Sequence, residues 1–303
     1  MTAGRSQHLR AALLMMSSTV CFGLMAVAIK LASATLHTFE IAFFRNFFGL
    51  MAALPLLLRH GPGLLRTAQL PRYVFRCFIG IVSMLCGFWA IGHLPLAQAV
   101  ALSYSTPIFV TIAAVIFLHE QVRARRWAAV ALGFAGMIVI VRPGTDGFSA
   151  GTLVALVAAV LSGIVSIQIK LLSKTEPADR IVLLTTLLWV PMSLLPALTV
   201  WEWPHGIAWV WVIAAGFLGT GGHMLWTRAL KLGDVSALTP ISFMQLPLVA
   251  VAGWLLFQEP LDRWTAIGAG VIFAANAYIA HREARLARSS ATHAPVEAAK
   301  PGE

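Results

Sequence analysis

The stretch LPLAQAVALSYSTPIFVTIAAVIFLHE, at residues 94–120, decides the fold because a second stretch repeats its layout. That second stretch is LGDVSALTPISFMQLPLVAVAGWLLFQE, at residues 232–259. Each carries a proline inside a long apolar run and ends on a glutamate. The two prolines, Pro107 and Pro247, are 140 residues apart. This correspondence predicts that the chain contains two copies of one structural unit.

Other residues match at nearly the same offset and in the same order along the chain. The matched pairs are Gly23 and Gly163, Lys30 and Lys170, Gly80 and Gly219, Ala90 and Ala229, and Gly133 and Gly270. We therefore predict a first unit at residues 1–147, a second at residues 148–285 and a disordered cytoplasmic tail at residues 286–303. The tail is rich in Ser, Ala, Pro, Glu and Lys, and cannot form a core.

The chain contains about ten apolar stretches, each long enough to cross the ~30 Å hydrocarbon core of a membrane as a helix. The expected spans are 11–30, 38–58, 73–91, 96–117, 125–141, 150–171, 180–200, 208–230, 235–257 and 264–281. Because five spans per unit is an odd number, the second unit must lie upside down relative to the first. The sequence predicts an all-α polytopic membrane protein with ten transmembrane helices in two inverted five-helix repeats. Many secondary transporters have such repeats.

The composition supports a membrane protein and argues against a soluble one. Of the 303 residues, 59% are hydrophobic and only 11% are charged, against roughly 25% charged in a soluble domain. The net charge of +10 does not indicate nucleic-acid binding, because the basic residues lie in short loops and form no basic helix. With the N-terminus inside, most Lys and Arg residues fall on one side, which predicts that both termini are cytoplasmic.

Short motifs in both units resemble those of the ten-helix EamA-type branch of the drug/metabolite transporter superfamily. They are the runs 94–99 and 105–107, Phe117-Leu118-His119-Glu120, Leu232-Gly233-Asp234-Val235-Ser236 and Phe257-Gln258-Glu259. The resemblance extends over residues 10–283, and within the superfamily the chain looks most like bacterial exporters of aromatic and other amphipathic amino acids. It implies a multi-pass protein of the bacterial inner membrane. It also implies a central cavity lined mainly by the first, third, fourth, sixth, eighth and ninth spans.

The sequence contains no motif typical of an enzyme, a metal site or a cofactor site. It has no P-loop, no His-Glu-x-x-His and no Gly-x-Ser-x-Gly. The glycines of residues 216–222 lie inside an apolar span, where they favour close helix packing over nucleotide binding. A membrane enzyme would need convergent acids, histidines or a metal. We therefore expect a transporter that acts as a monomer in the lipid bilayer, without cofactor or metal.

Polar and aromatic residues within the spans are the candidate substrate contacts, because polar groups in hydrocarbon are costly unless they pair or face a cavity. The candidates are Ser83, Phe88, Tyr104, His223, Trp226, Phe243 and Gln245. The serine, the histidine and the glutamine are candidate polar contacts, and the four remaining rings are candidate apolar walls. Tight packing alone is the alternative for each of them.

Small residues and prolines at matched depths are the candidate hinges and gates. They are Gly80, Gly87, Pro107, Gly219, Gly222 and Pro247. Glycines permit close sliding of helices, and prolines act as bend points. The glutamates at the span ends, Glu120 and Glu259, are expected to cap the helices that follow them.

The charges indicate what the protein moves. The span centres offer no cation for a phosphate, which favours a neutral or zwitterionic solute. Arg45 is the one deep cation, and we expect a structural role for it, with Glu40 as a possible partner or with its head group reaching the interface. The function expected is export of small amphipathic metabolites, above all aromatic and other neutral amino acids, by alternating access and without ion coupling. Proton-coupled antiport through His223 and an intramembrane enzyme are the alternatives.

Overall fold

The fold is built from helices alone in the part of the chain that the structure describes. The computed structural model describes residues 2–60, 67–118, 124–144, 149–232, 238, 241–260 and 262–292. The helices of the first unit are α1 (Thr2–Ala32), α2 (Thr38–His60), α3 (Leu70–His93), α4 (Leu96–Ser103), α5 (Thr106–Leu118) and α6 (Ala124–Val141). Those of the second are α7 (Ala150–Leu172), α8 (Ala178–Ala197), the short 3-10 helix η2 (Leu198–Val200), α9 (Ala208–Leu232), α11 (Gln245–Phe257) and α12 (Arg263–Thr292).

Length, composition and surface identify a polytopic membrane protein. Among the described residues, six helical segments are long and apolar enough to cross a membrane. They are Leu9–Ala32, Leu70–His93, Leu96–Phe117, Ala150–Leu172, Arg180–Val200 and Ala208–Leu230, and two shorter apolar helices are Trp127–Val141 and Gln245–Phe257. Large apolar side chains are exposed around the bundle, among them Leu195 at 70% and Ile207 at 66%. Such a surface suits lipid rather than water. The predicted all-α membrane class is confirmed, whereas the ten-span count and the cytoplasmic termini stay predictions.

Two helices are interrupted at corresponding places. In the first unit, Tyr104 and Ser105 form a turn between α4 and α5, and in the second, Phe243 and Met244 form a turn just before α11. Both turns lie on the N-terminal side of a mid-span proline. Proline causes such breaks because its ring clashes with the carbonyl four residues earlier and it has no N–H to donate. Residues 233–237, where the other half of the ninth expected span begins, lie outside the described residues.

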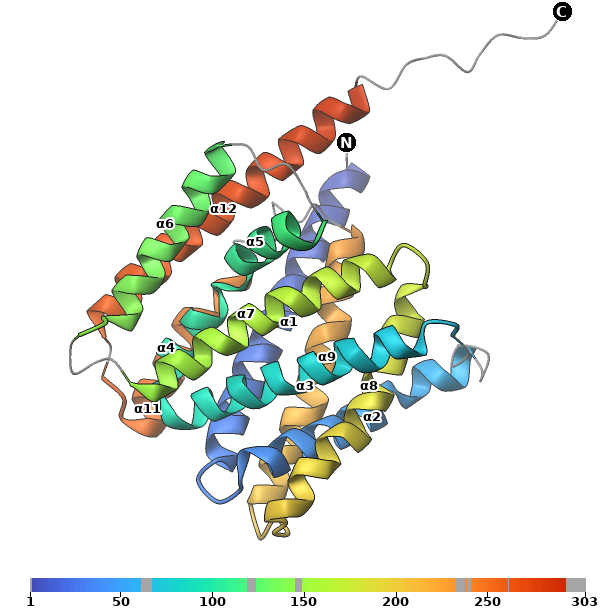
Figure 1. Cartoon of the computed structure of the whole chain (residues 1–303), viewed down its shortest axis with the longest axis vertical. Coiled ribbons are helices and arrows are strands. Elements are labelled where there is room, and N and C mark those ends of the chain that lie inside the picture. Colours follow the sequence, from blue (N-terminus) through green and yellow to red (C-terminus); the bar gives the residue numbers. More distant parts are fainter. Residues whose placement is uncertain are drawn as a thin grey trace, which may run out of the picture.

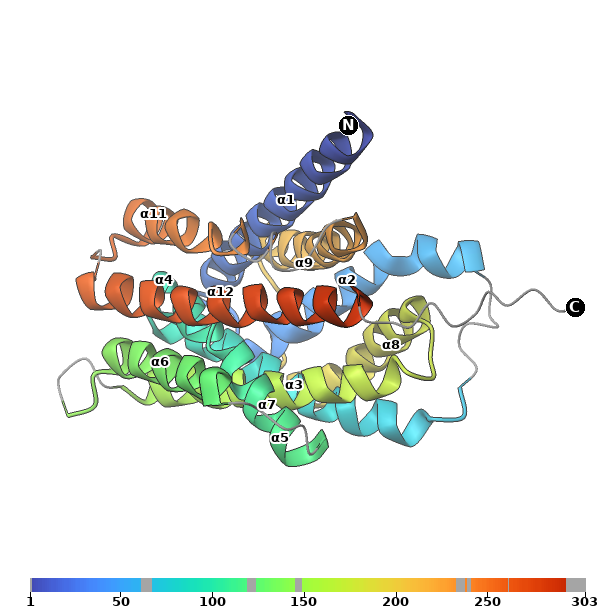
Figure 2. The same cartoon turned by 90° about the horizontal axis from the view of Figure 1, so that it is seen from above.

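The packing of the helices follows the repeat. Helix α1 packs on α9, and α3 packs on α7, while α2 packs on α8 and α6 on α12. In the order of the helices, α1 corresponds to α7, α2 to α8, α3 to α9 and α6 to α12. Exchanging the two units therefore converts the α1–α9 pair into the α7–α3 pair and leaves the other two pairs unchanged. Figures 1 and 2 both show α6 and α12 running side by side at the edge of the bundle. Their close approach requires glycine, because a Cβ at Gly136 would lie 2.8 Å from the carbonyl oxygen of Gly268.

A hydrogen-bonded carboxylate lies in a turn outside the long apolar segments. Glu176, in the turn between α7 and α8, accepts hydrogen bonds from the Thr67 hydroxyl at 2.6 Å and from Arg180 at 2.7 Å. These bonds lower the pKa of the Glu176 carboxyl below its ordinary value.

Towards the C-terminus, α12 continues to Thr292, past the boundary expected at residue 285. Residues 293–303 of the expected tail lie outside the described residues.

Candidate functional site

The two helix breaks meet each other. Tyr104 and Phe243, the first residues of the two turns, stack with ring centroids 4.2 Å apart and planes 26° from parallel. The Tyr104 hydroxyl donates to the carbonyl of Ser242 at 2.5 Å and lies 3.1 Å from Oε1 of Gln245. Three of the predicted substrate contacts are therefore brought together at the junction of the units.

Side chains satisfy the backbone carbonyls that the breaks set free. The Thr106 hydroxyl donates to the carbonyl of Ser103 at 2.8 Å, and the amide nitrogen of Asn276, on α12, donates to the carbonyl of Tyr104 at 2.9 Å. A backbone carbonyl without a partner inside a membrane costs several kcal/mol. These bonds let broken helices persist within the apolar bundle and fix α12 to the junction.

An ion pair joins the two units near one end of the bundle. Lys30, at the end of α1, pairs with Glu259, which follows α11, and its Nζ also donates to the carbonyl of Leu94 at 2.6 Å. The second carboxylate oxygen of Glu259 accepts the N–H of Leu96, the first residue of α4, at 2.7 Å. A left-handed turn at Gln258 (φ 54°) directs the chain back to this point. We call Lys30, Glu259 and the two backbone groups that they bind the clamp.

The clamp corrects the expected role of Glu259. This carboxylate caps α4 of the opposite unit, and the start of α12 is capped by Asp262, which accepts the N–H of Thr265 at 3.0 Å. Asp262 also pairs with Arg142 at 3.0 Å. Glu120, the counterpart of Glu259 in the repeat, lies outside the described residues.

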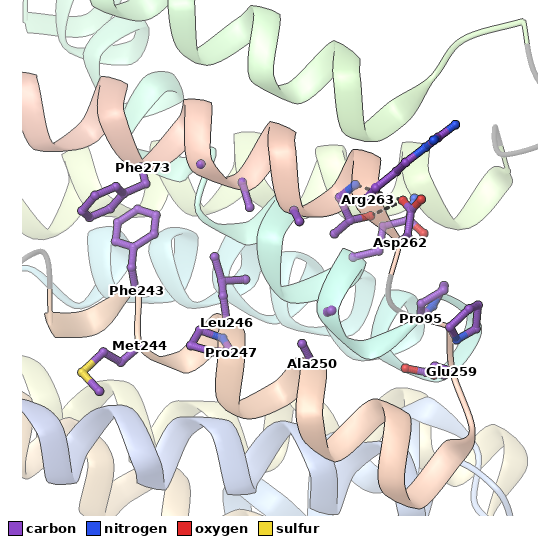
Figure 3. A pocket seen from close by; sticks show the side chains of 17 residues that line it. Pro95, Phe243, Met244, Leu246, Pro247, Ala250, Glu259, Asp262, Arg263 and Phe273 are labelled. Carbon is purple, nitrogen blue, oxygen red and sulfur yellow. Dashed lines mark hydrogen bonds between the residues drawn. The ribbon is translucent and has the colours of Figure 1, made fainter.

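A cavity of about 590 Å³ lies between α4, α11 and α12. Figure 3 shows Phe243 and Phe273 facing each other at one end and Asp262 and Arg263 at the other. Pro247 also lines this cavity, so two predicted residues border it.

The walls of this cavity lead to the outer surface of the bundle. Met244, which lines it, is 50% exposed, and the same face of α11 continues with Val251 at 52% and Trp254 at 56%. The cavity is therefore a lateral groove bordered by apolar surface. It differs from the central cavity that the resemblance implies.

Arg45 is buried where α2, α8 and α9 meet. Its side chain is 7% exposed, and its guanidinium lies 6.0 Å from the Trp189 ring and donates to Oδ1 of Asn46 at 3.0 Å. The partnership expected with Glu40 is wrong, because that carboxylate instead accepts the backbone N–H groups of His37 and Glu202. Among the residues that the structure describes, no ion pair includes Arg45.

His223 and Trp226 lie on an accessible, inward-turned side of α9. Val210, Phe217 and Met224 are exposed and recur every seven residues, so they mark the outer face of this helix. Trp226 comes about two and a half turns after Phe217 and thus points the opposite way, yet it is 42% exposed. His223 is exposed as well and packs edge-on against Phe22 of α1, with centroids 5.0 Å apart.

The remaining predicted contacts join helices. Ser83 donates to the carbonyl of Ala158 at 2.8 Å and lies 2.8 Å from the Ser162 hydroxyl, so it ties α3 to α7. Phe88 is buried in a core cluster formed largely by α1, α2 and α9. The structure therefore does not bring these two residues to the junction with Tyr104.

The predicted hinge glycines all lie at helix contacts. An added Cβ at Gly80 would lie 3.3 Å from the Trp189 ring, and one at Gly87 would lie 3.9 Å from Ala158. An added Cβ at Gly219 would lie 2.8 Å from Arg45, and one at Gly222 would lie 3.0 Å from Phe22. The prolines lie beside the helix breaks. Each of these residues is thus placed where helices approach closely or change direction.

Comparison with known proteins decides the family. The profile of the EamA-like transporter family matches residues 9–142 and again residues 149–280. The chain belongs to the EamA-like transporter family. The first match falls within residues 1–147 and the second within residues 148–285, and the resemblance stated from the motifs is confirmed.

The relatives of this EamA-like protein are named as transporters, not as enzymes. The riboflavin transporter of Vibrio cholerae is 32% identical and covers 74% of this chain and 76% of its own. The S-adenosylmethionine uptake transporter of Rickettsia felis is 28% identical, covering 84% and 86%, and the pseudopaline exporter of Pseudomonas aeruginosa is 30% identical, covering 87% and 93%. A crystal structure with a TM-score of 0.63 and 21% identity covers 90% of this chain and 98% of its own, and has the same fold.

Two features of this EamA-like transporter were not predicted from its sequence. The clamp was signalled only by the repeat, in which both a Lys pair and a Glu pair match. Among the described residues Arg45 has no acidic partner, whereas the sequence offered Glu40 as a possible one at a spacing of five residues. Among the described residues, no group of three His, Cys, Asp or Glu side chains is placed to hold a metal ion.

Proposed function

We propose that this EamA-like transporter exports small amphipathic metabolites across the bacterial inner membrane by alternating access. Ten spans form two inverted units that join near residue 147, both termini are cytoplasmic, and one copy of the chain is the working unit. The solute is neutral or zwitterionic, and aromatic and other neutral amino acids are the class that suits it best. It moves down its own gradient without a coupled ion.

The stacked helix breaks are the observation that carries this proposal. Secondary transporters with inverted repeats place their central site where discontinuous helices of the two repeats meet. Tyr104 and Phe243 begin the two turns and lie ring against ring at that junction. The packing pairs, which survive exchange of the units, support the same arrangement.

The difference between the two ends of the bundle supports alternating access. The clamp closes the end at Lys30, which the distribution of Lys and Arg predicts to be the outer one. Phe22, which packs against His223, lies eight residues before Lys30 on α1 and thus about 12 Å from it along the helix axis. Beyond that point the inner side of α9 is accessible at Trp226. A state closed outside and accessible from inside is one of the two that the mechanism requires.

The names of the relatives bear on the solute. Riboflavin and S-adenosylmethionine each combine a flat ring system with polar groups, and this combination favours an amphipathic solute here too. The relatives include uptake transporters and an exporter. The outward direction therefore rests on the resemblance to amino-acid exporters.

Transport into proteoliposomes tests the proposal. Purified protein is offered phenylalanine, methionine, threonine, riboflavin and a phosphosugar, first without and then with a pH gradient. We expect flux of phenylalanine and methionine that the pH gradient leaves nearly unchanged. Phosphosugar exchange without amino-acid flux would contradict the solute class. Uphill movement driven by the pH gradient, and abolished by His223→Ala, would show that the protein is a proton-coupled antiporter.

A further inference from the structure

We propose that Arg45 and Trp189 bind the carboxylate of the transported solute. This inference rests on the proposed function and deepens it, since it gives the amphipathic solute an anionic group and names the side chains that recognise it. It also revises the structural role that the sequence suggested for Arg45.

The two side chains present buried N–H donors that lack acceptors. Arg45 is more than nine-tenths buried, and within the described part of the chain neither its Nε nor the buried Nε1 of Trp189 has a hydrogen-bond partner. A buried donor left unpaired costs free energy, and a buried charge without a counter-charge costs more. A carboxylate supplies the missing charge, and its two oxygens accept several hydrogen bonds. Anionic oxygen is therefore the chemistry that this place lacks.

Two glycines pack directly against these donors. A Cβ at Gly219 would lie 2.8 Å from an Nη of Arg45 and 2.8 Å from the sulfur of Met25, and one at Gly80 would lie 3.3 Å from Nε1 of Trp189. Any larger residue would press on the guanidinium or the indole nitrogen. The donors thus lie where α1, α2, α3, α8 and α9 converge, bounded by glycine backbone.

The position suits an amphipathic solute. Gly219, His223 and Trp226 follow one another along the same side of α9, at spacings of four and three residues. This side is buried at Gly219, next to Arg45, and accessible at His223 and Trp226. A carboxylate at Arg45 would place the rest of the solute along these two rings, which offer an aromatic surface for an apolar body.

A purely structural role for Arg45 makes a different forecast. If the guanidinium only supports Asn46, which in turn bonds Ser193 of α8 at 3.2 Å, its replacement will change stability for all solutes alike. If it binds the solute, replacement will change the ranking of solutes. Selectivity, measured as a ratio, separates the two.

The test compares solutes with and without the carboxylate. Competition against labelled phenylalanine uptake in proteoliposomes is measured with phenylalanine, phenylalanine amide and 3-phenylpropanoate, for the wild type, Arg45→Gln, Arg45→Lys and Trp189→Phe. Arg76→Gln is the matched control, because Arg76 is also a buried arginine with an unpartnered Nε and lies on α3 beside Thr185. The same solutes are ranked by their effect on thermal unfolding of the detergent-solubilised protein, which needs no flux.

We expect the wild type to prefer each carboxylate over the amide by at least about tenfold, the factor that corresponds to 1.4 kcal/mol. Arg45→Gln should reduce this ratio to near one, Trp189→Phe should reduce it in part, and Arg76→Gln should keep it. An unchanged ratio in Arg45→Gln, or no preference in the wild type, overturns the inference. If Arg45→Gln does not fold, the inference is overturned when Arg45→Lys and Trp189→Phe both prefer carboxylate over amide by the same factor as the wild type. Absence of binding and flux for every amphipathic solute would instead overturn the proposed function.

Discussion

Removing the charge from the clamp should open the end of the bundle that it closes. Glu259→Gln keeps the size of the side chain and an oxygen that can accept the Leu96 N–H, but it removes the negative charge that faces Lys30. Under alternating access, the clamp can form only while this end is closed, since its partners come from both units. The substitution should therefore favour the state that is open at this end.

The burial of the pair sets the size of the effect. Breaking a fully buried ion pair costs about 3–5 kcal/mol, and exposed pairs contribute about 0–1 kcal/mol. The Lys30 and Glu259 side chains are 12% and 15% exposed, so the pair lies between these limits. Lys30 also keeps its bond to the carbonyl of Leu94. We take about 1–3 kcal/mol, which shifts a two-state population roughly 5- to 150-fold.

Cysteine labelling measures this shift. Val100 is 5% exposed and belongs to a core cluster with Leu96, so a cysteine there should react with a membrane-impermeant maleimide only when this end opens. Val100→Cys is made in a protein whose three native cysteines are replaced, and labelling from outside is timed with and without Glu259→Gln. We expect faster labelling in the variant.

Glu202→Gln is the control, because it removes an exposed glutamate from the loop before α9 and should leave labelling unchanged. Exchanging the charges, with Lys30→Glu and Glu259→Lys together, should return labelling towards the wild-type rate. Equal labelling rates in the wild type and Glu259→Gln would refute the reasoning that the clamp holds this end closed.

Three further predictions concern the junction, the helix contacts and acid stability. Tyr104→Phe keeps the stack but removes the hydrogen bond from the Tyr104 hydroxyl to the Ser242 carbonyl, so the detergent-solubilised protein should lose about 0.5–1.5 kcal/mol of stability against thermal unfolding. Gly219→Ala should lower both flux and melting temperature, because its Cβ would lie 2.8 Å from a guanidinium nitrogen, whereas Gly221→Ala, with nothing within 4 Å, should keep flux and gain up to about 1 kcal/mol. Hydrogen bonds lower the pKa of Glu176, so its contribution to stability is present above the ordinary carboxyl pKa and lost as the pH falls through the lowered value. Wild type should therefore unfold at a higher temperature than Glu176→Gln at pH 7, and this difference should shrink on acidification.

The apolar runs were enough to predict where helices lie, and the prolines predicted where two of them bend. A run of apolar residues requires helix in a membrane because each backbone group must bond within the segment, and the described helices follow the expected spans. The break at Tyr104 follows from Pro107 in the same local way. The repeat then placed Tyr104, Phe243 and Gln245 among the candidates, and the structure brings these three together.

Contacts between distant helices could not be predicted, since the rotation and partner of each helix are tertiary choices. Glu259 was expected to cap the next helix, and nothing in its neighbourhood of sequence indicates the N–H of Leu96 in the other unit. Ser83 has the composition of a cavity residue, yet it bonds across to α7. For Arg45, spacing suggested Glu40, but both oxygens of that carboxylate are used by backbone N–H groups.

Under the proposed alternating access, the stacked pair of Tyr104 and Phe243 also bears on the energy balance of the transport cycle. Two identical units would give the inward-facing and outward-facing states equal free energies, because exchanging the units would turn one state into the other. Here the Tyr104 hydroxyl of the first break bonds the Ser242 carbonyl at the second, and Phe243 has no hydroxyl with which to make the reciprocal bond. Each such divergence between the copies removes part of the degeneracy. The sequence differences between the two halves of a duplicated carrier thus determine which of its two orientations has the lower free energy at rest.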